Sequence, residues 1–304
     1  SKALVNAAGP WVAKFIKDDL KLESPYGIRL IQGSHLIVPK LYDAPNAFIL
    51  QNEDQRIVFT IPYMDQFTII GTTDREYTGD PAKVSITEEE TEYLLNVVNA
   101  HFKKQVSRAD ILRTYSGVRP LCNDESDNPS AVTRDYTLAL SGVPGEAPLL
   151  SVFGGKLTTY RKLAESAMAQ LTPFFTQIKP SWTASATLPG GEDMTTPAAL
   201  SAALINAHSW LDAAIAKRWA ITYGNRAWRL LDGAQSLEDM GEHIGSGLYS
   251  REVDYLCTQE WALDAQDILW RRTKLGLFTT AQEQEHLARY MTSLNLKHRK
   301  VEAA

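Results

Sequence analysis

The sequence predicts a mixed fold, α+β with an α/β portion, followed by an all-α C-terminal domain. Short runs rich in β-branched and aromatic residues fill positions 26–73, which is typical of neighbouring antiparallel strands. At positions 149–171 a buried strand runs through two glycines into a helix, the pattern of an α/β unit. After Pro189-Gly190-Gly191 the apolar residues recur at helical spacing only.

The first residues predict a buried strand that ends in a turn. Leu4 to Ala8 is a short, mostly apolar run that stops at Gly9-Pro10. A strand at this position needs a sheet built by later segments, and no crossover helix precedes it. We therefore expect the chain to begin partway through a longer protein, with Ser1 as a cloning remnant.

The segment from Tyr26 to Thr73 predicts four strands joined by turns. Turn-forming residues such as Asn52-Glu53-Asp54 and Met64-Asp65 separate the apolar runs. Short connections favour hairpins, so we expect an antiparallel meander. The four predicted strands are Ile28 to Pro39, Ala47 to Gln51, Arg56 to Pro62 and Gln66 to Thr73.

A capping box opens the helix that follows. Thr87 and Glu90 stand three positions apart ahead of an apolar stripe, and acids fill the first turn, so a helix is expected through about Lys104. Three further strands and one helix are predicted at Thr114 to Val118, Ala131 to Leu140, Leu149 to Phe153 and Thr158 to Leu171. The C-terminal domain is expected to be wholly helical, with helices at Leu200 to Trp219, Asn225 to Leu231, Ser250 to Glu260 and Ala281 to Leu294.

Composition limits the classes of function. The chain has 304 residues with 31 Lys plus Arg against 36 Asp plus Glu, and this acidic balance argues against a nucleic-acid binder, which needs a dense basic surface. The two cysteines stand apart and no Cys/His cluster has zinc spacing, so neither a disulfide framework nor a metal site is predicted. No apolar run reaches the roughly 18 residues of a spanning helix, so any membrane contact is expected to be peripheral.

The strand-to-helix turn at residues 149–160 is the first candidate site. Gly154 and Gly155 precede the helix start, so backbone N–H groups and the positive helix end are able to face an electron-rich ligand, with Lys156 beside them. A phosphate and a flavin carbonyl would both suit this arrangement. A turn that needs glycine only for close packing fits the local pattern as well.

Two arginines and one histidine are the other candidates. Arg119 ends an apolar strand before Pro120, where a guanidinium is well placed to bind a carboxylate or phosphate, and Arg134 follows 15 positions later. A surface ion pair of Arg119 with an acid of the 124–127 segment is the alternative. His35 lies in an apolar strand as a candidate general base, although such a histidine is more often structural.

The helix predicted from Leu157 to Phe175 carries one apolar stripe. Lys156, Arg161 and Lys162 lie near its start, so the helix has the composition of one that lies on anionic lipid. Core packing explains the same stripe, and we favour it.

Five segments follow one another along the chain: Leu4 to Trp11, Gly33-Ser34-His35, Ile69 to Asp74, Ser116 to Leu121 and Phe153 to Arg161. Taken together they resemble the FAD-dependent glycerol-3-phosphate dehydrogenases, most closely the bacterial aerobic, respiratory type. Trp270 to Gly276 is similar to the C-terminal cap of that family, so the resemblance covers essentially the whole chain.

The resemblance implies a D-amino-acid oxidase-like fold, in which a Rossmann-type FAD domain is interleaved with an antiparallel-sheet substrate domain. Residues 1–25 would be the last part of the FAD domain, 26–148 the substrate domain, 149–180 the returning strand and helix of the FAD domain, and 181–304 the helical cap. The family's N-terminal Gly-rich fingerprint and its adjacent Arg-Tyr pair have no counterpart in this sequence. We expect roughly 200 residues, about one domain, to be missing, and the fragment alone to be inactive.

For the intact enzyme the resemblance implies oxidation of sn-glycerol 3-phosphate to dihydroxyacetone phosphate, with hydride transfer to FAD. Arg119 and Arg134 would contact the substrate, Lys156 its phosphate or the flavin, and His35 would be the base, with Arg119 beside it in the catalytic site. The expected contacts to FAD come from Gly9, Trp11, Gly154, Gly155, Lys156, Leu157 and Thr158.

Ubiquinone or menaquinone would accept the electrons, which implies an enzyme bound peripherally to the membrane surface on the cytoplasmic face of the inner membrane. The oligomeric state stays open, with a homodimer as one option. The alternatives are an oxygen-using glycerophosphate oxidase, an amine-oxidising member of the same superfamily, and a non-catalytic membrane or interaction role for the helical region from Gly191 to Ala304.

Overall fold

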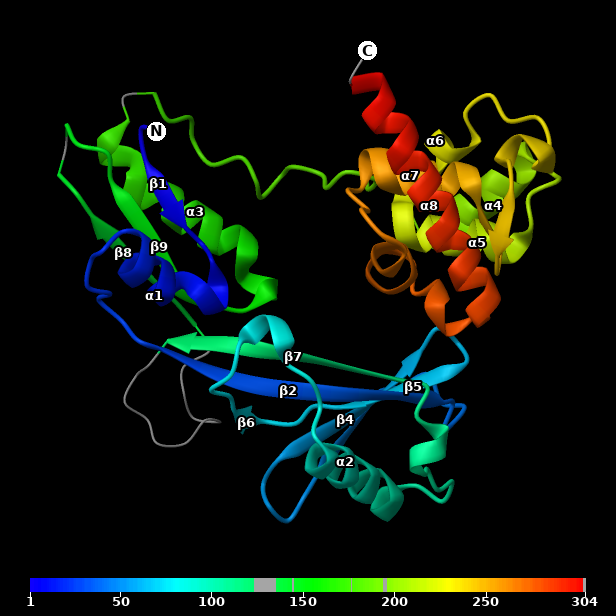
Figure 1. Ribbon diagram of the computed structural model, residues 1–304, viewed down its shortest axis with the longest axis horizontal. Helices are drawn as coiled ribbons and strands as arrows, with labels where there is room; N and C mark the ends of the chain where they lie inside the picture. The colour runs from blue at the N-terminus through cyan, green and yellow to red at the C-terminus, as the bar shows by residue number, and fades with distance from the viewer. Residues whose placement is uncertain (123–134, 144, 176, 194–195, 303–304) are drawn as a thin grey trace. The chain divides into compact units, whose positions relative to one another are not determined.

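The computed structural model describes residues 1–122, 135–143, 145–175, 177–193 and 196–302 (Figure 1). The chain divides into two compact units, Ser1–Ala184 and Ser185–Ala304. Ser181 and Thr183 donate hydrogen bonds to Glu165 at 2.6 and 2.5 Å, which ties the end of the first unit to its last helix. The finer boundaries expected inside the first unit stay predictions.

A three-stranded sheet contains the N-terminal strand. Strand β1 (Leu4–Asn6) pairs in parallel with β9 (Leu149–Gly154), and β8 (Tyr136–Ser141) pairs antiparallel with the other edge of β9. Helix α3 (Tyr160–Leu171) packs Ala167 and Leu171 against Leu150 of this sheet. The first strand thus joins a sheet that later segments build, as expected, and the short helix α1 (Val12–Lys14) follows it.

The six-stranded sheet has a different order from the expected meander. Its strands are β2 (Ile28–Pro39), β3 (Phe48–Gln51), β4 (Ile57–Tyr63), β5 (Phe67–Gly71), β6 (Arg75–Glu76) and β7 (Arg113–Cys122). The order is β3-β4-β5-β2-β6, and β7 pairs with β2. Only β3, β4 and β5 form a meander, because β2 is long enough to pair with β5 and β6 along one edge and with β7 along the other, as in a Greek key.

Helix α2 (Glu88–His101) covers one face of this sheet (Figure 1). Leu94 and Val98 of the helix are fully buried against Leu36, Val58 and Ile70 of the strands. The predicted capping box of Thr87 and Glu90 is present. The helix ends at His101, before the expected Lys104, because Phe102 already has extended backbone angles.

The second unit contains α4 (Pro197–Ala207), α5 (Ala213–Tyr223), α6 (Ala227–Leu231), α7 (Ser250–Gln259) and α8 (Ala281–Glu302). The single helix predicted from Leu200 to Trp219 is wrong: Asp212 accepts hydrogen bonds from Ala214 and Ile215 N–H groups and starts a second helix.

The second unit is mainly helical, as expected, but it also contains one short hairpin. Strands β10 (His243–Gly245) and β11 (Leu248–Tyr249) form a hairpin. Ser246 and Gly247 at its turn both have positive φ, and this conformation ends the helical pattern locally. A π-helical turn at Asp267–Arg272 was not expected either.

Candidate functional site

The pairing of β2 with β5 and β7 brings the predicted catalytic residues onto one face of the six-stranded sheet. His35 lies opposite Gly71 on one side and Tyr115 on the other, and Gly33 lies opposite Gly117. Side chains two positions apart along a strand share a face, so Arg119 lies on the same face as these residues. This is the face opposite to α2, whose core partners Leu36 and Val38 alternate with His35.

Arg119 is held by two side chains that the sequence did not single out. Its Nη1 donates to Asp74 Oδ1 at 2.6 Å and its Nη2 donates to Thr72 Oγ1 at 3.0 Å. A methyl group on Gly33 would lie 2.6 Å from both Nη2 and Thr72 Oγ1, so only glycine leaves room for this contact. The ion pair of Arg119 with Asp74 is partly buried. The bonds to Asp74 and Thr72 use two of the five N–H donors of the guanidinium.

The alternative of an ion pair between Arg119 and the 124–127 segment falls outside the described residues, as does the predicted substrate residue Arg134. The described partner of Arg119, Asp74, lies 45 positions away in sequence and reaches it through strand register. The expected catalytic and substrate-binding roles of Arg119 stay predictions.

His35 is half-buried and stacks on Tyr115. The two ring centroids lie 4.6 Å apart with planes only 4° from parallel. Burial, and secondarily the charge of Arg119, lowers the pKa of His35 from 6.5 to about 4, so the ring is neutral near neutral pH. Its Nδ1 atom is buried and has no hydrogen-bond partner among the described residues.

Gly71 provides the space for this histidine. A methyl group at Gly71 would lie 2.3 Å from Cδ2 of the ring. Burial raises the pKa of Tyr115, with the nearby Tyr63 hydroxyl adding to the effect, and burial also raises the pKa of Tyr63. A neutral imidazole and two neutral phenols therefore lie together on this face.

The second predicted group lies where β1 and β9 end. These strands are parallel neighbours, so the turns that follow them lie at the same edge of the sheet. Gly9 has a φ of 55°, and Trp11 is exposed. Buried Asn6 holds this turn, because its side chain donates to Val12 O at 3.0 Å and accepts from Ala8 N at 3.3 Å.

The turn after β9 needs glycine at both expected positions. Gly154 and Gly155 have φ values of 71° and 96°, which side chains rarely adopt. Lys156 and Thr158 are exposed, and Leu157 is 89% exposed ahead of α3. The backbone thus turns outward where the chain enters a helix, as the sequence predicts.

The two groups meet at the end of β7. A methyl group on Gly154 would lie 3.6 Å from Pro120 O and 3.5 Å from Cys122 N, so Gly154 contacts the strand that carries Arg119. The turn Gly9–Trp11 also contacts β7 and β9. All the described site residues therefore lie on connected elements of one unit.

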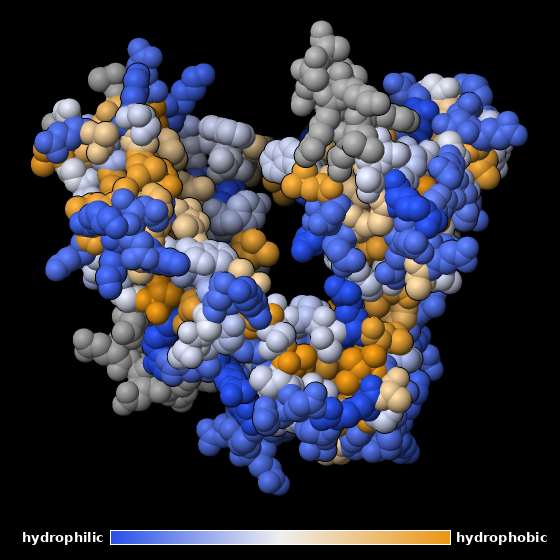
Figure 2. Space-filling view, viewed as in Figure 1, coloured by the Kyte–Doolittle hydropathy of each residue, from blue (hydrophilic) through white to orange (hydrophobic). Residues whose placement is uncertain are grey.

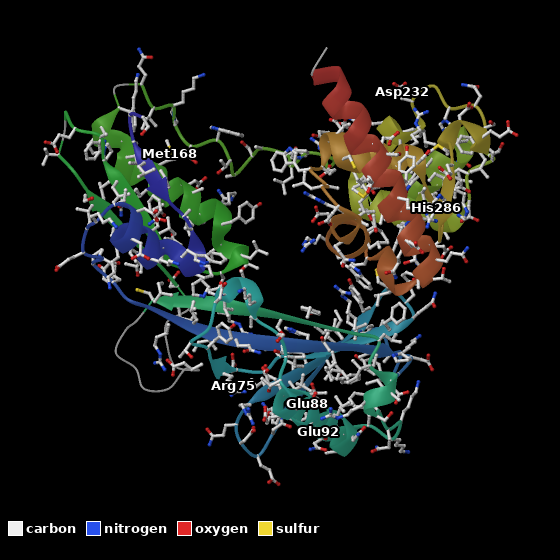
Figure 3. All side chains as sticks on the ribbon, in the orientation of Figure 1. Arg75, Glu88, Glu92, Met168, Asp232 and His286 are labelled. Carbon is white, nitrogen blue, oxygen red and sulfur yellow. The ribbon has the colours of Figure 1, made fainter. Side chains whose placement is uncertain are left out.

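The apolar stripe of residues 157–175 is partly core. Ala167 and Leu171 are buried with Leu150, whereas Leu157 and Tyr160 are exposed, as is Met168, which is labelled in Figure 3. Only Ala167 and Leu171 of the stripe agree with core packing, whereas four of its residues, Ala164 among them, are exposed. The exposed half remains available for a ligand or a membrane.

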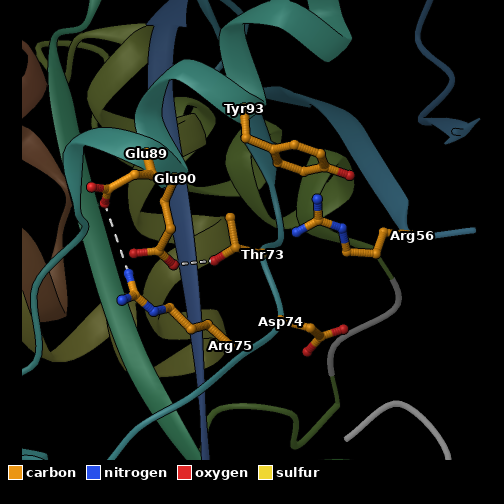
Figure 4. Close-up of a pocket in the computed structure, with 7 residues that line it drawn as sticks. All are labelled: Arg56, Thr73, Asp74, Arg75, Glu89, Glu90 and Tyr93. Atoms are coloured by element: carbon orange, nitrogen blue, oxygen red, sulfur yellow. Dashed lines mark hydrogen bonds and ion pairs between the residues drawn. The ribbon is translucent and has the colours of Figure 1, made fainter. Parts of the chain in front are cut away.

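Two cavities lie in the first unit, and the first of them is lined in part by Asp74 of the Arg119 site. One of about 480 Å³ is lined by Arg56, Thr73, Asp74, Arg75, Glu89, Glu90 and Tyr93 (Figure 4). The other, about 640 Å³, is lined by residues between Ala13 and Gly27.

Within the described ranges, no cluster of His, Cys, Asp and Glu is arranged to hold a metal ion. No described helix combines the length and apolarity needed to cross a bilayer.

Sequence reasoning missed Thr72, Asp74 and Tyr63 as parts of the site, although Thr72 and Asp74 lie in a segment already noted for its resemblance. The only local signal of Thr72 and Asp74 is a run of polar residues directly after an apolar strand. Two glycines in strands, Gly33 and Gly71, were the stronger signal, because a glycine inside a strand often marks a close approach.

Known proteins resemble the chain along its whole length. The model of the FAD dependent oxidoreductases matches residues 1–161, and that of the C-terminal domain of alpha-glycerophosphate oxidase matches residues 181–299. The glycerol-3-phosphate dehydrogenase of Pseudomonas tolaasii is 72% identical over 100% of this chain and 60% of its own length. The aerobic glycerol-3-phosphate dehydrogenase of Escherichia coli strain K12 is 53% identical over 96% of this chain and 58% of its own.

A solved structure has a similar fold. The glycerol-3-phosphate dehydrogenase from Bacillus halodurans, complexed with FAD, has a TM-score of 0.75 and 25% identity over 97% of this chain and 62% of that one. The chain thus spans about three fifths of the length of the proteins it matches. These matches confirm the predicted D-amino-acid oxidase-like fold with a helical C-terminal domain and FAD as the cofactor of the family. The chain belongs to the family of FAD dependent oxidoreductases.

Proposed function

We propose that these residues belong to an enzyme that oxidises sn-glycerol 3-phosphate to dihydroxyacetone phosphate. The names of the relatives support the substrate, and the model of the alpha-glycerophosphate oxidase C-terminal domain supports it over residues 181–299. The single observation that carries the proposal is the shared face of Arg119 and His35, which presents a cation and a neutral base side by side.

The residues fit an FAD site and a substrate site next to it. The two positive-φ glycines at the end of β9 and the orphaned Nδ1 of His35 are features that a bound group would explain. FAD, when bound, accepts a hydride and so removes two electrons from the C2–H bond of the alcohol. Gly9, Trp11, Gly154, Gly155, Lys156, Leu157 and Thr158 would hold it through backbone donors and the helix start.

Arg119 would bind the oxygens of the substrate. Its guanidinium is fixed by Asp74 and Thr72, so it loses little side-chain freedom on binding an anion. Lys156 would contribute a second positive charge, and Arg134 a third.

His35 would take the proton of the C2 hydroxyl as the hydride leaves. The ring is neutral and able to accept this proton. A dianionic substrate beside Arg119 would offset one of the two causes of its lowered pKa, because the charge of Arg119 would then be neutralised. Substrate binding would thus make His35 a stronger base.

Anaerobic bleaching of the flavin band tests this function. The full-length flavoprotein that contains this chain is mixed with glycerol 3-phosphate, glycerol or a simple amino acid. We expect bleaching with glycerol 3-phosphate alone. Bleaching by the amino acid alone would contradict the proposal and indicate an amine oxidase.

We also propose ubiquinone or menaquinone as the electron acceptor, and peripheral binding of the enzyme to the inner face of the cytoplasmic membrane. Exposed apolar side chains on the outer strands of the sheet, Ile49, Ile57, Phe59 and Ile61, support contact with a quinone or lipid. Figure 2 shows apolar side chains in patches on a mostly hydrophilic surface. Hydrogen peroxide in stoichiometric yield would indicate an oxidase instead.

Co-sedimentation with phosphatidylglycerol vesicles tests the membrane contact. Trp261, 82% exposed, and Leu263 offer a second apolar surface in the helical unit. If the sheet contacts the membrane, the pair Phe59→Ser and Ile61→Ser weakens co-sedimentation, and the pair Trp261→Ser and Leu263→Ser does not. The reverse result would assign membrane docking to the helical unit.

A homodimer remains one option for the assembly, and light scattering of the same samples measures the oligomeric state.

A further inference from the structure

Glu90, at the start of α2, is a buried carboxylate that accepts four hydrogen bonds. Oε2 accepts from Gln32 Nε2 at 2.7 Å and from the Thr87 N–H group at 2.9 Å. Oε1 accepts from Ser34 Oγ at 3.0 Å and from Thr73 Oγ1 at 2.5 Å, the contact drawn in Figure 4. The carboxylate therefore joins α2 to β2 and to the segment after β5.

The capping box accounts for only part of this arrangement. Thr87 and Glu90 exchange the two bonds of the box, and such a box forms equally well on an exposed helix end. Burying a carboxylate is costly unless its charge is fully satisfied by donors. The three side-chain donors from the sheet are therefore an additional feature, which the cap does not require.

Each of these three donors is the sequence neighbour of a residue in the Arg119 site. Gln32 and Ser34 flank Gly33, whose missing side chain leaves room for the guanidinium. Thr73 lies between Thr72 and Asp74, the two residues that bind Arg119. In strand β2 the side chains of Gln32 and Ser34 point to the face opposite Gly33. Thr73 likewise binds Glu90 whereas its neighbours Thr72 and Asp74 bind Arg119, so Glu90 fixes from behind the backbone that forms the Arg119 site in front. Figure 4 shows the Asp74 carboxyl pointing away from Glu90.

The network also joins the strands to one another. The Ser34 N–H group donates to Thr73 Oγ1 at 2.9 Å, and the Thr73 N–H group donates to Ser34 O at 3.4 Å. Ser34 Oγ and Ser116 Oγ lie 2.9 Å apart, which extends the network to β7, the strand of Arg119. Thr73 is the link between the carboxylate and the two residues that hold the guanidinium.

We propose that Glu90 is a positioning residue for Arg119, which acts through Thr73 and Gly33 to fix the guanidinium where it binds the substrate anion. This inference rests on the proposed role of Arg119 in substrate binding. Glu90 does not touch the substrate, so its loss weakens binding more than it slows the chemical step.

Thr73→Val in the full-length flavoprotein is the direct test, and Thr68→Val is its matched control. Both threonines are buried, at 2% and 1% exposure, and both hydroxyls accept a backbone N–H group, from Ser34 and Leu41. Only Thr73 donates to Glu90. We expect Thr73→Val to raise the KM for glycerol 3-phosphate about tenfold, the effect of one lost hydrogen bond to a charged group. Thr68→Val should lower the melting temperature and leave the KM unchanged.

Two further variants separate positioning from folding. Glu90→Gln keeps the volume of the side chain and loses acceptor capacity toward the hydroxyls, so the KM should rise with a smaller change in kcat. Thr87→Ala removes the threonine half of the capping box and should lower the melting temperature without raising the KM.

The outcomes distinguish the two proposals. If Arg119→Lys raises the KM while Thr73→Val and Glu90→Gln do not, the positioning role is wrong and the substrate role of Arg119 stands. Equal effects of Thr73→Val and Thr68→Val also overturn it, because they indicate a general loosening of the sheet. If Arg119→Lys itself leaves the KM unchanged, the proposed function of Arg119 fails first.

Discussion

Arg119 and Asp74 form a partly buried ion pair, 2.6 Å between Nη1 and Oδ1, at a point where two strands and the segment after a third come together. Thr72 holds the second terminal nitrogen at 3.0 Å. A guanidinium forked in this way has a defined direction, which a single ion pair would not give. The pair therefore orients a cation on the face that also carries His35.

We expect Arg119→Lys to raise the KM for glycerol 3-phosphate by about 10- to 100-fold, because an ammonium cannot bind Asp74, Thr72 and an anion with the same planar geometry. Steady-state kinetics of the full-length flavoprotein measures the effect. Arg108 is the control: it pairs with Glu88 and Glu92 on the exposed face of α2, both labelled in Figure 3, so Arg108→Lys should leave the KM unchanged. Equal KM values for both variants and the parent would contradict the role of Arg119.

Gly33→Ala should destabilise the first unit by about 1–3 kcal/mol, because the new methyl group overlaps Arg119 and Thr72 in a packed site. Gly117→Ala is the matched control, because Gly117 is the register partner of Gly33 and a methyl group at Gly117 meets no atom within 4 Å. Its melting temperature should equal or slightly exceed that of the parent. Thermal unfolding of both variants measures the difference, and equal losses would show that strand glycines are required for backbone reasons instead.

The low pKa of His35 predicts a loss of stability in weak acid. In the unfolded chain the ring gains a proton near pH 6.5, whereas in the folded chain it does so only near pH 4. Between these values the unfolded state binds more protons, so the contribution of His35 is fully present above pH 6.5 and is lost as the pH falls toward 4.

Melting temperatures of the parent and of His35→Gln from pH 7 to pH 4 check this prediction. The parent should lose stability more steeply than the variant, with a slope difference of at most about one proton. Parallel curves for the parent and His35→Gln would indicate that His35 titrates alike in both states.

The sequence predicted a helix or strand well where the signal lay within the element itself, as an apolar run or a capping box. Strand β2 has the bounds expected from its apolar run, and α2 begins at the capping box. The missed break between α4 and α5 had a local signal too, because Asp212 is a strong N-cap residue, but the continuous apolar pattern outweighed it.

The candidate site could be predicted only in part, because its contacts join strands that are far apart in the sequence. Arg119 and His35 were selected for their chemistry, but the pairing of Arg119 with Asp74 depends on the register of β2 with two other strands. Strand order and register depend on pairing between segments far apart in the sequence, which the local patterns used for the prediction do not specify. Glu90 was noted only as a helix cap, because its sheet partners Gln32 and Ser34 lie more than 50 positions away.

The helical unit offers a prediction about stability that is independent of catalysis. Glu252 is fully buried and binds Arg218 through both oxygens, at 2.5 and 2.8 Å, and it also accepts from the Tyr223 hydroxyl at 2.6 Å. Glu252→Gln should cost about 3–5 kcal/mol, because it leaves the buried guanidinium without its countercharge. Replacing both charges, Arg218→Met with Glu252→Gln, should recover much of that loss. Denaturant unfolding of the second unit within the intact chain measures both, against Glu285→Gln, whose exposed pair with Arg289 should contribute less than about 1 kcal/mol. A double variant less stable than Glu252→Gln would mean that the guanidinium is stabilised mainly by Gly247 O, which accepts from its Nη2 at 2.8 Å.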